Sequence, residues 1–400
     1  MTQHQLKKGY YTLEGINAFA TAYYFNYLFF FMQARFGYGN MENLLLSATN
    51  GFVYMFSAWW GGRFAERFGY FSALWVGFST MCAALLCGAT VQALAGHWGV
   101  MVVWAAGMCF TWPALEALVS EGETARTLPR RIGVYNLTWA GGSGFAYFTG
   151  GALLEVLGDR GLFLVPAALH VVQLLLLGWL QRRRKRAVAS APVKVIGAPL
   201  ESPAGHFCRA RAKNFLALAW LANPFAYMAI NTIIAVIPGL ATRHGLSPMW
   251  AGFFCSLWFF SRMGAFAVLW LWPGWHYRFR WFIGALLLTA VSFVVILLSS
   301  ALWPVMVAQV AFGAAVGLIY YSSLFYSMDV GETKGEHGGI HEAAIGAGIF
   351  AGPAVGATAL ALLPAQPSAG AWAVAALLLA GAAAAAIIRW HSWRHERRTS

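Results

Sequence analysis

Long apolar segments recur along the whole sequence, and each is long enough to cross a lipid bilayer. A transmembrane helix needs about 20 predominantly apolar residues. Membrane β-barrels show alternating polar and apolar residues, a pattern absent here, so each segment must satisfy its own backbone polar groups as a helix. The sequence therefore predicts an all-α integral membrane protein. Its twelve expected transmembrane helices lie at about 11–33, 42–62, 70–92, 98–120, 132–156, 161–180, 214–240, 247–272, 279–300, 303–327, 340–363 and 370–389.

The basic residues are distributed as membrane topology would place them. Hydrophobic residues make up 60% of the chain and charged residues only 10%, yet the net charge is +13. Of the 27 Lys and Arg residues, only Arg35, Arg160 and Arg243 fall in loops on one side, and Arg262 falls inside a predicted span. Cytoplasmic loops carry the excess of Lys and Arg. The pattern predicts a multi-pass protein of the inner (plasma) membrane with both termini cytoplasmic, contacts with lipids and no nucleic-acid partner.

The two halves of the sequence resemble each other. A polar stretch separates six spans from six, so we expect a bundle at 1–181, a cytoplasmic linker at 182–213 and a second bundle at 214–400. An offset of 206 residues aligns "INAFA" at 16–20 with "ANPFA" at 222–226, and it also aligns Gly107 with Gly313 and Gly142 with Gly348. Transporter folds commonly contain such internal repeats. We therefore expect two pseudo-symmetric six-helix bundles.

A short motif between the second and third predicted helices resembles a known family signature. "GRFAERFG" at 62–69 places Gly62, Glu66, Arg67 and Gly69 as in the cytoplasmic loop of the major facilitator superfamily. "PALEALVSEGE" at 113–123 resembles the end of that family's fourth helix, with Glu121 at the acid that pairs with the loop's basic residue. The resemblance implies the family's twelve-helix fold, a small-molecule substrate, and a central cavity lined by the first, fourth, seventh and tenth helices.

The charges of this motif predict a cytoplasmic gate. A carboxylate and a guanidinium from different helix ends can form a charge-assisted pair that holds one conformation and breaks in another. Glu66, Arg67 and Glu121 are the residues expected to form this latch. The alternative is that they are ordinary solvated loop charges.

Polar residues inside the spans are the candidates for the substrate cavity or for ion coupling. Glu14, Asn17, Thr21 and Tyr24 share one face of the first helix, and Asn223, Tyr227 and Asn231 form a similar stripe on the seventh. Ionisable groups within the membrane are costly and point to function. The alternative for any one asparagine is a hydrogen bond that joins two helices. Glu14 is the carboxylate favoured for proton coupling.

Further candidates come from other spans. Glu116 in the fourth helix and Arg262 in the eighth are the remaining intramembrane charges, and Asn136 lies near the start of the fifth. Arg262 could pair with a carboxylate of the protein, hold an anionic group of a substrate, or extend toward the cytoplasmic surface. The aromatic residues that could stack on a substrate ring are Trp112, Trp139, Trp258, Tyr320 and Tyr321.

His341 and Glu342 begin the eleventh predicted helix at its cytoplasmic rim. A zinc-protease motif needs a second histidine four residues after the first, and Ile345 occupies that position. We favour a gate or helix-cap role for the two residues over a proton relay. Neither metal-ligand spacing nor a cofactor motif is present, so no metal or cofactor is expected.

These features together favour a secondary active transporter over an enzyme. The predicted function is movement of a small organic solute by alternating access, with protons as the candidate coupling ion, in a monomer. The alternatives are an uncoupled facilitator or uniporter, a sensor, and a membrane-embedded enzyme that would use His97, His170, His244 or His341. The histidines are scattered on both sides of the membrane and within different spans, and the chain lacks a nucleotide-binding loop.

Overall fold

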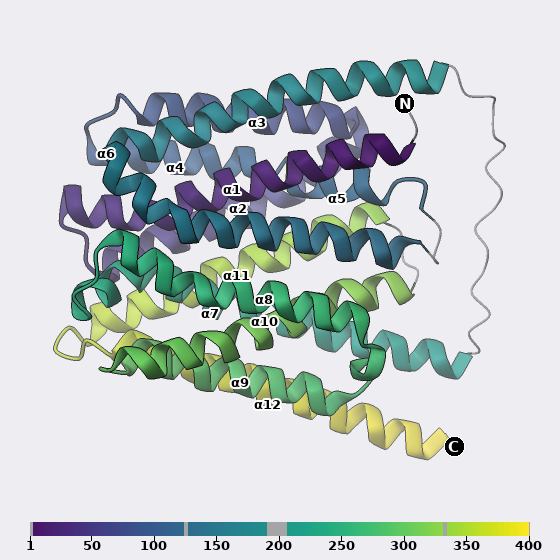
Figure 1. Cartoon of the computed structure of the whole chain (residues 1–400). Helices are drawn as coiled ribbons and strands as arrows, with labels where there is room; N and C mark the ends of the chain where they lie inside the picture. The colour runs from purple at the N-terminus through teal and green to yellow at the C-terminus, as the bar shows by residue number, and fades with distance from the viewer. Residues whose placement is uncertain (1–2, 124–126, 190–205, 331–333, 400) are drawn as a thin grey trace.

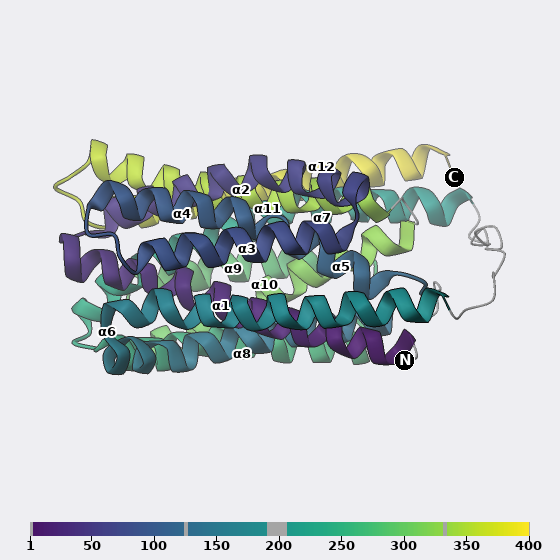
Figure 2. The ribbon, with the colours of Figure 1, turned by 90° about the horizontal axis from the view of Figure 1, so that it is seen from above.

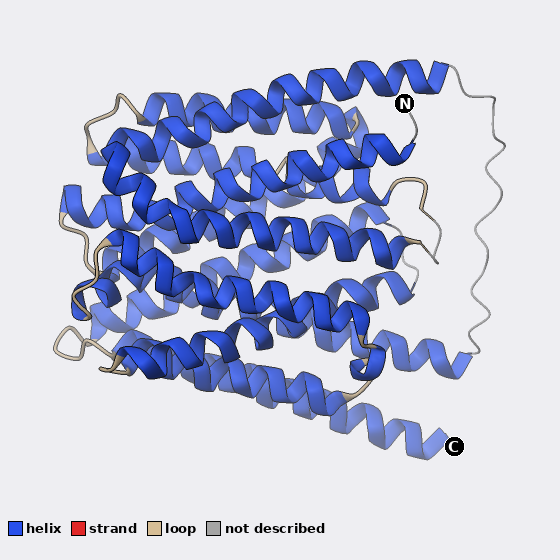
Figure 3. Cartoon of the chain, viewed as in Figure 1, coloured by secondary structure: helices blue, strands red, loops and turns tan. Residues whose placement is uncertain are grey.

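The computed structural model describes residues 3–123, 127–189, 206–330 and 334–399. Every regular element in these ranges is helical (Figure 3). The helices are α1 (Gln3–Phe36), α2 (Asn40–Phe68), α3 (Tyr70–Gly88), α4 (Leu94–Met108), α5 (Trp112–Ser120), α6 (Leu128–Ala189), α7 (His206–Arg243), α8 (Pro248–Leu271), the 3-10 turn η1 (Pro273–Trp275), α9 (Phe279–Leu298), α10 (Leu302–Val330), α11 (Lys334–Leu362) and α12 (Ala369–Thr399).

Two of these elements differ from a simple series of twelve rods. The predicted fourth helix, 98–120, is broken into α4 and α5, because Pro113 has no N–H to donate and the chain tightens into i to i−3 hydrogen bonds at Phe110 and Thr111. α6 contains the predicted fifth and sixth helices, which meet at Gly158 with φ 66°. A glycine adopts this conformation without a steric penalty, so the two arms of α6 run in opposite directions (Figure 1).

Several helices extend beyond their predicted spans. Within the described residues, nine helical stretches are long and apolar enough to cross a membrane, and one of them, Arg130–Arg186, contains the turn at Gly158. α1 and α2 carry more polar residues, but they contain 34 and 29 residues and lie alongside the others (Figure 1). The second arm of α6 continues to Ala189, so the arginine-rich stretch at 182–186, predicted to belong to the linker, is helical.

The helices of the two halves occupy different parts of the molecule. In Figure 1, α1–α6 form the upper part and most of α7–α12 the lower part, with both termini at the same end. Figure 2 shows the same elongated bundle from above. The halves meet where α2 packs against α11 and where the first arm of α6 packs against α8. A site between the halves would therefore be lined by helices of both.

Equivalent glycines pack in equivalent ways in the two halves. A Cβ added at Gly142 of α6 would lie 2.8 Å from the carbonyl oxygen of Gly15 on α1. A Cβ added at Gly348 of α11 would clash with the carbonyl group of Pro224 on α7. Small residues allow such close approach between membrane helices. The repeat found by the 206-residue offset therefore corresponds to a repeated helix contact.

The outer surface is apolar, as expected for a protein that contacts lipid. Large apolar side chains are strongly exposed on several helices, including Leu175 at 71%, Leu271 at 78% and Trp303 at 71%. A soluble monomer rarely exposes so many large apolar groups. The buried core, by contrast, contains Glu14, Asn17, Asn50, Asn231 and Arg262 among its polar residues.

Candidate functional site

A cavity of about 170 Å3 lies between the two halves. Helices from both halves line it: α1, α2, α4, α5 and α6 on one side, and α7, α8, α10 and α11 on the other. Its walls combine amide, hydroxyl and charged groups with aromatic rings and isoleucines. The lining residues are Thr21, Ala22, Phe25, Asn26, Asn50, Tyr54, Trp104, Met108, Trp112, Trp139, Ser143, Tyr227, Ile230, Asn231, Ile234, Trp258, Phe259, Arg262, Tyr320, Glu342, Ile345 and Ile349.

The structure brings part of the predicted set to this cavity. Thr21, Tyr227, Asn231, Arg262 and Tyr320 line it. Glu342, predicted for the cytoplasmic gate, lies in the cavity wall as well. The aromatic candidates Trp112, Trp139 and Trp258 also line the cavity, whereas Tyr321 does not.

Other predicted cavity residues lie elsewhere in the core. Asn17 donates from Nδ2 to Thr111 Oγ1 at 3.2 Å, and Asn136 Oδ1 accepts from Trp139 Nε1 at 3.1 Å. Tyr24 packs edge-on against Trp104, with ring centroids 4.7 Å apart. Helical spacing places residues on one face of α1, but the neighbouring helices decide which part of that face they cover. Glu14 and Asn17 face neighbouring helices inside the first half. Of the four predicted residues on this face of α1, Thr21 is the one that lines the cavity.

Glu14, Glu116 and Asn223 also lie outside the cavity lining. Glu14 is 0% exposed and lies beside Tyr135 of α6. Glu116 and Glu342 are close enough to Glu14 to interact with it electrostatically. Glu14, Glu116 and Glu342 are called the carboxylate cluster below. Asn223 is buried in α7, and neither atom of its side-chain amide has a hydrogen-bond partner in the described part of the chain.

Glu342 connects the carboxylate cluster to the cavity and to the other half of the molecule. It begins the membrane-spanning part of α11, and its Oε2 accepts a hydrogen bond from Tyr54 Oη on α2. The two residues are 288 positions apart in the sequence. The side chain of His341, the other predicted member of this gate, lies outside the described residues.

Among the described residues, Arg262 is the one basic residue in the cavity wall. It is 2% exposed on α8, and Nη2 donates to Tyr227 Oη at 3.4 Å. Its guanidinium carbon lies 4.7 Å from the centroid of the Trp139 ring and 5.0 Å from that of Tyr320. No ion pair involves Arg262 within the described ranges. Of the three alternatives for Arg262, pairing with a protein carboxylate therefore does not occur in these ranges.

Several cavity residues were not predicted from the sequence. Asn26, Asn50 and Ser143 contribute polar groups, and Tyr54 and Trp104 contribute rings. The two asparagines had a usable signal, because polar side chains inside spans are candidates for function. The rings had no such signal, since aromatic residues make up 16% of the chain.

The predicted latch residues gather at the end of the molecule that holds the termini. Glu121 Oε1 accepts from Arg184 Nη2 at 2.8 Å, and Arg184 lies in the second arm of α6. Arg67 lies over the Phe68 ring, with 5.3 Å from its guanidinium carbon to the ring centroid. Glu66, Glu121 and Arg184 all interact electrostatically with Tyr70. Gly69 has φ 88° and forms the turn between α2 and α3, whereas Gly62 is buried within α2.

A second cluster of charged side chains, centred on Glu123, lies two residues along the chain from Glu121. Glu123 forms ion pairs with Lys7 Nζ and with Arg131 Nε, the latter at 3.0 Å. Burial alone would raise the pKa of Glu123, but the hydrogen bonds from Lys7, Thr127 and Arg131 outweigh it and lower the pKa to about 2. The side chains of Lys7 and Glu123 are 3% and 8% exposed, so solvent screens this pair weakly.

This geometry predicts a pH-dependent contribution to stability. Because the pKa of Glu123 is lowered on folding, the contribution is fully present above the ordinary value of about 4.3 and is lost as the pH falls toward 2. We expect Glu123→Gln to lower the free energy of unfolding at pH 7 by about 1–2 kcal/mol. Thermal unfolding of both proteins between pH 7 and pH 3 measures the difference, which should shrink below about pH 4.

The matched control is Glu121→Gln, because Glu121 is 46% exposed in its pair with Arg184. An exposed pair contributes about 0–1 kcal/mol. Equal effects of the two substitutions, or a Glu123→Gln effect that does not change with pH, would contradict the role assigned to burial.

Contacts between the two halves lie toward both ends of the molecule. At the end opposite the termini, Met249 N near the start of α8 donates to Glu155 Oε1 of α6 at 2.8 Å. At the end with the termini, Leu128 and Ile132 of α6 form a buried apolar cluster with Leu324 of α10. A carboxylate beside a helix N-terminus is favourable because of the helix dipole. These two contacts, each of which joins the two halves, are called the seals below.

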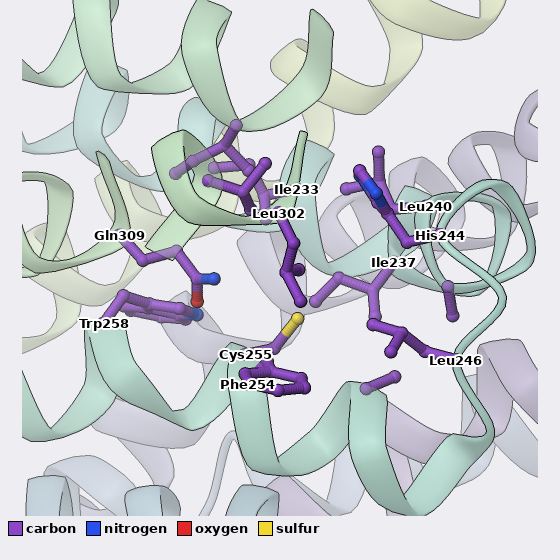
Figure 4. Close-up of a pocket in the computed structure, with 14 residues that line it drawn as sticks. Ile233, Ile237, Leu240, His244, Leu246, Phe254, Cys255, Trp258, Leu302 and Gln309 are labelled. Atoms are coloured by element: carbon purple, nitrogen blue, oxygen red, sulfur yellow. The ribbon is translucent and has the colours of Figure 1, made fainter. Parts of the chain in front are cut away.

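A second pocket lies entirely within the second half (Figure 4). Its volume is about 20 Å3, room for little more than one water molecule. Ile233, Ile237, Leu302 and Cys255 surround it, and Trp258 separates it from the central cavity by lining both. Its size and apolar walls exclude it as the site for an organic solute.

The residues of the enzyme alternative do not assemble a site. His97 packs against Phe31, with ring centroids 4.9 Å apart, whereas His170 Nδ1 lies 2.7 Å from Gln173 Oε1. His244 lines the small pocket in the other half. Among the described residues, no group of three or more His, Cys, Asp or Glu side chains is placed to hold a metal ion.

Comparison with known proteins agrees with the fold. The sequence profile of the Major Facilitator Superfamily matches residues 18–353. No curated protein sequence matches the chain. A solved bacterial homologue of the human lysosomal transporter Spinster, in an inward-facing and unoccupied conformation, superposes with a TM-score of 0.68 at 14% identity, over 98% of this chain and 95% of that one. A bacterial homologue of the human drug peptide transporters PepT1 and PepT2 gives a TM-score of 0.71 at 13% identity over all of both chains.

These identities are low, so the two structures support the fold alone. The profile match, in contrast, covers most of the chain. It agrees with the motif at 62–69 and with the helical architecture. The chain is a multi-pass membrane transport protein and belongs to the major facilitator superfamily.

Proposed function

We propose that the protein is a secondary active transporter that moves a small organic solute by alternating access and couples this movement to protons. The observation that carries the proposal is the cavity between the halves, which is lined by both of them and contains Arg262 and Glu342. A solute bound there touches both halves at once. Rocking of one half against the other would then expose the same site to each side in turn.

The two seals support alternating access. Opening the end near the termini requires Leu128 and Ile132 to separate from Leu324. Opening the other end requires Glu155 to leave the N-terminus of α8. Each seal joins the two halves, so it can break while the helix packing inside each half is kept. We infer that the units that move are the predicted bundles, 1–181 and 214–400.

The carboxylate cluster supports proton coupling. Glu14 and Glu116 lie in the first half and Glu342 in the second, and the three interact electrostatically. A change in the proton occupancy of one therefore affects the others. Glu342 also binds Tyr54 across the halves, so its protonation state would alter an inter-half contact. An uncoupled facilitator would have no need for these buried acids.

We infer that the termini are cytoplasmic and that the protein lies in an inner (plasma) membrane. Both termini and the arginine-rich C-terminal end of α6 lie at one end of the bundle, and positive charge favours the cytoplasmic side. The central cavity is complete within one chain, which supports a monomer as the functional unit.

Cysteine labelling tests the cavity and alternating access together. In a cysteine-free variant, Thr21→Cys and Asn231→Cys should react with small hydrophilic thiol reagents, because both residues line the cavity. Reagents that cannot cross the membrane should reach these cysteines from either side. Arg182→Cys and Arg160→Cys mark the cytoplasmic and outer sides, and Leu175→Cys, on the outer apolar surface, is the unreactive control.

The labelling pattern distinguishes a transporter that works by alternating access from a protein whose cavity opens to one side or not at all. Reaction of the cavity cysteines from one side only would contradict alternating access, and no reaction would contradict the cavity itself. Labelling of Arg160→Cys from the cytoplasmic side would reverse the orientation without affecting the transport proposal.

A further inference from the structure

We propose that the substrate is an organic anion with a planar ring, whose acidic group binds Arg262. The inference rests on the proposed transport function and names the substrate class of the same cavity. It comes from the contrast between a buried cation and the groups that surround it.

Arg262 is a buried positive charge without an anionic partner in the described part of the chain. It is 2% exposed, and its Nε has no hydrogen-bond acceptor there. A buried charge is strongly unfavourable unless it is paired and hydrogen-bonded. The contact with Tyr227 Oη, at 3.4 Å, supplies a dipole rather than a charge. The guanidinium therefore keeps an unpartnered N–H donor and an unpaired charge in the described part of the chain, and an anionic ligand can satisfy both.

Four aromatic rings surround the guanidinium group. Its central carbon lies 4.7 Å from the Trp139 centroid, 5.0 Å from Tyr320, 5.6 Å from Phe266 and 5.7 Å from Tyr227. Cation–π contacts stabilise an arginine in the absence of a counter-ion. They leave its net charge in place, because an aromatic ring carries no charge. The rings thus hold the cation in position and keep it available for an anionic ligand.

The carboxylate that faces the same cavity is engaged by another partner. Glu342 accepts the hydrogen bond of Tyr54, and it forms no ion pair with Arg262. Both groups still act on Tyr320 and Tyr227 electrostatically, so they share one environment. A substrate anion can therefore bind at Arg262 without displacing Glu342 from its hydrogen bond with Tyr54.

The rest of the cavity suits a flat apolar body. Its volume is about 170 Å3, and an apolar cavity of about 150 Å3 is known to hold benzene. Trp112, Trp139 and Trp258 provide ring faces, and Ile230 and Ile345 provide apolar contacts. An aromatic ring with one acidic substituent fits both the volume and the lining. A carboxylate also matches the two parallel N–H donors of an arginine.

Binding of an anionic substrate would explain why transport is coupled to protons. A negative potential inside the cell opposes the entry of an anion. A proton that crosses with the anion cancels its charge. The carboxylate cluster beside the cavity can carry that proton, which links the substrate class to the proposed coupling.

Binding to purified protein tests the inference. The probes are benzoate, phenylacetate, 1-naphthoate and indole-3-acetate, each compared with its neutral primary amide. We expect at least one carboxylate to raise the unfolding temperature of the native protein, and its amide to bind about 10–100-fold more weakly. Arg262→Gln should weaken carboxylate binding by a similar factor, whereas Arg262→Lys should restore part of it.

Arg160→Gln is the matched control, because Arg160 is an exposed arginine outside the cavity. It should bind the carboxylates as the native protein does. Should Arg262→Gln fail to fold, the difference between carboxylate and amide on the native protein decides alone. Equal stabilisation by acids and amides, stabilisation by none of the acids, or unchanged binding to Arg262→Gln would overturn the inference.

The same experiments distinguish this inference from the proposed function. Proton-driven transport of a neutral solute that persists in Arg262→Gln would reject an anionic substrate and leave the transporter proposal intact. Cavity cysteines that do not react would instead reject the transport site, whatever the substrate class.

Discussion

Replacing Glu14 by glutamine is expected to abolish accumulation of the substrate against its gradient. Glu14 is 0% exposed, and it forms no ion pair within the described ranges. A charged carboxylate in such a place is energetically costly. We therefore expect Glu14 to hold a proton while it is buried and to release the proton when a conformational change exposes it to water. Glutamine has nearly the same shape but cannot carry a proton. The substitution therefore removes coupling while preserving packing.

Transport assays in proteoliposomes distinguish a loss of proton coupling from a loss of folded protein. With the solute that best stabilises the purified protein in a thermal-shift screen, an imposed pH gradient should drive accumulation by the native protein and only background uptake by Glu14→Gln. Exchange of labelled for unlabelled solute, which needs no net proton movement, should continue. Asp159→Asn is the control, because Asp159 is a half-exposed acid that is not part of the cavity lining.

Parallel variants identify the residue that couples. Glu116→Gln and Glu342→Gln remove the other two members of the carboxylate cluster. Full gradient-driven accumulation in Glu14→Gln would reject Glu14 as the coupling residue. If Glu342→Gln then lost accumulation, coupling would lie in the cavity wall, next to Tyr54.

Enlarging the glycines where α2 crosses α11 is expected to drive the protein out of this conformation. A Cβ at Gly346 would lie 2.6 Å from both Cα and N of Met55, and a Cβ at Gly51 would overlap the backbone of Ile349 and Phe350. Backbone atoms cannot rotate away as a side chain can. Gly51→Ala or Gly346→Ala must therefore separate the two helices, at a cost of about 1–3 kcal/mol.

α2 and α11 belong to different halves. The substitutions should therefore destabilise the conformation in which these two helices are in contact more than they destabilise the folded structure of either half. Distances between spin labels at the two ends of the molecule should change in either variant. The double variant should cost less than the sum of the single ones, since the first substitution already separates the helices. Gly264→Ala is the control, because a Cβ there meets nothing within 4 Å.

A different result would contradict this prediction. Unchanged distance distributions together with a large loss of thermal stability would mean that the crossing is part of a fixed core. The halves would then have to move about a different contact.

Most of the helical fold could be predicted from the sequence. Apolar length gave the spans, because a backbone inside a membrane must satisfy its own hydrogen bonds. The break before Pro113 was missed, although proline carried a signal for it. The helical continuation of α6 through Arg182–Arg186 was missed because charge alone does not end a helix.

The candidate site was only partly predictable. Spacing placed Thr21 and Asn231 on the right faces, and both line the cavity. The same spacing suggested Asn17, which instead donates to Thr111. A periodic pattern identifies a helix face, but it does not say which neighbour that face meets.

The sequence by itself determined that this chain crosses the membrane repeatedly as helices, in two related halves, because hydrophobic length and backbone hydrogen bonding are local properties. Only the tertiary structure decided which buried charges find partners. Glu342 meets Tyr54 across 288 positions, whereas Arg262 meets aromatic rings and no acid in the described residues. Such contacts depend on how distant helices cross and turn toward one another. That geometry arises from the packing of all the helices together, and no single segment contains it.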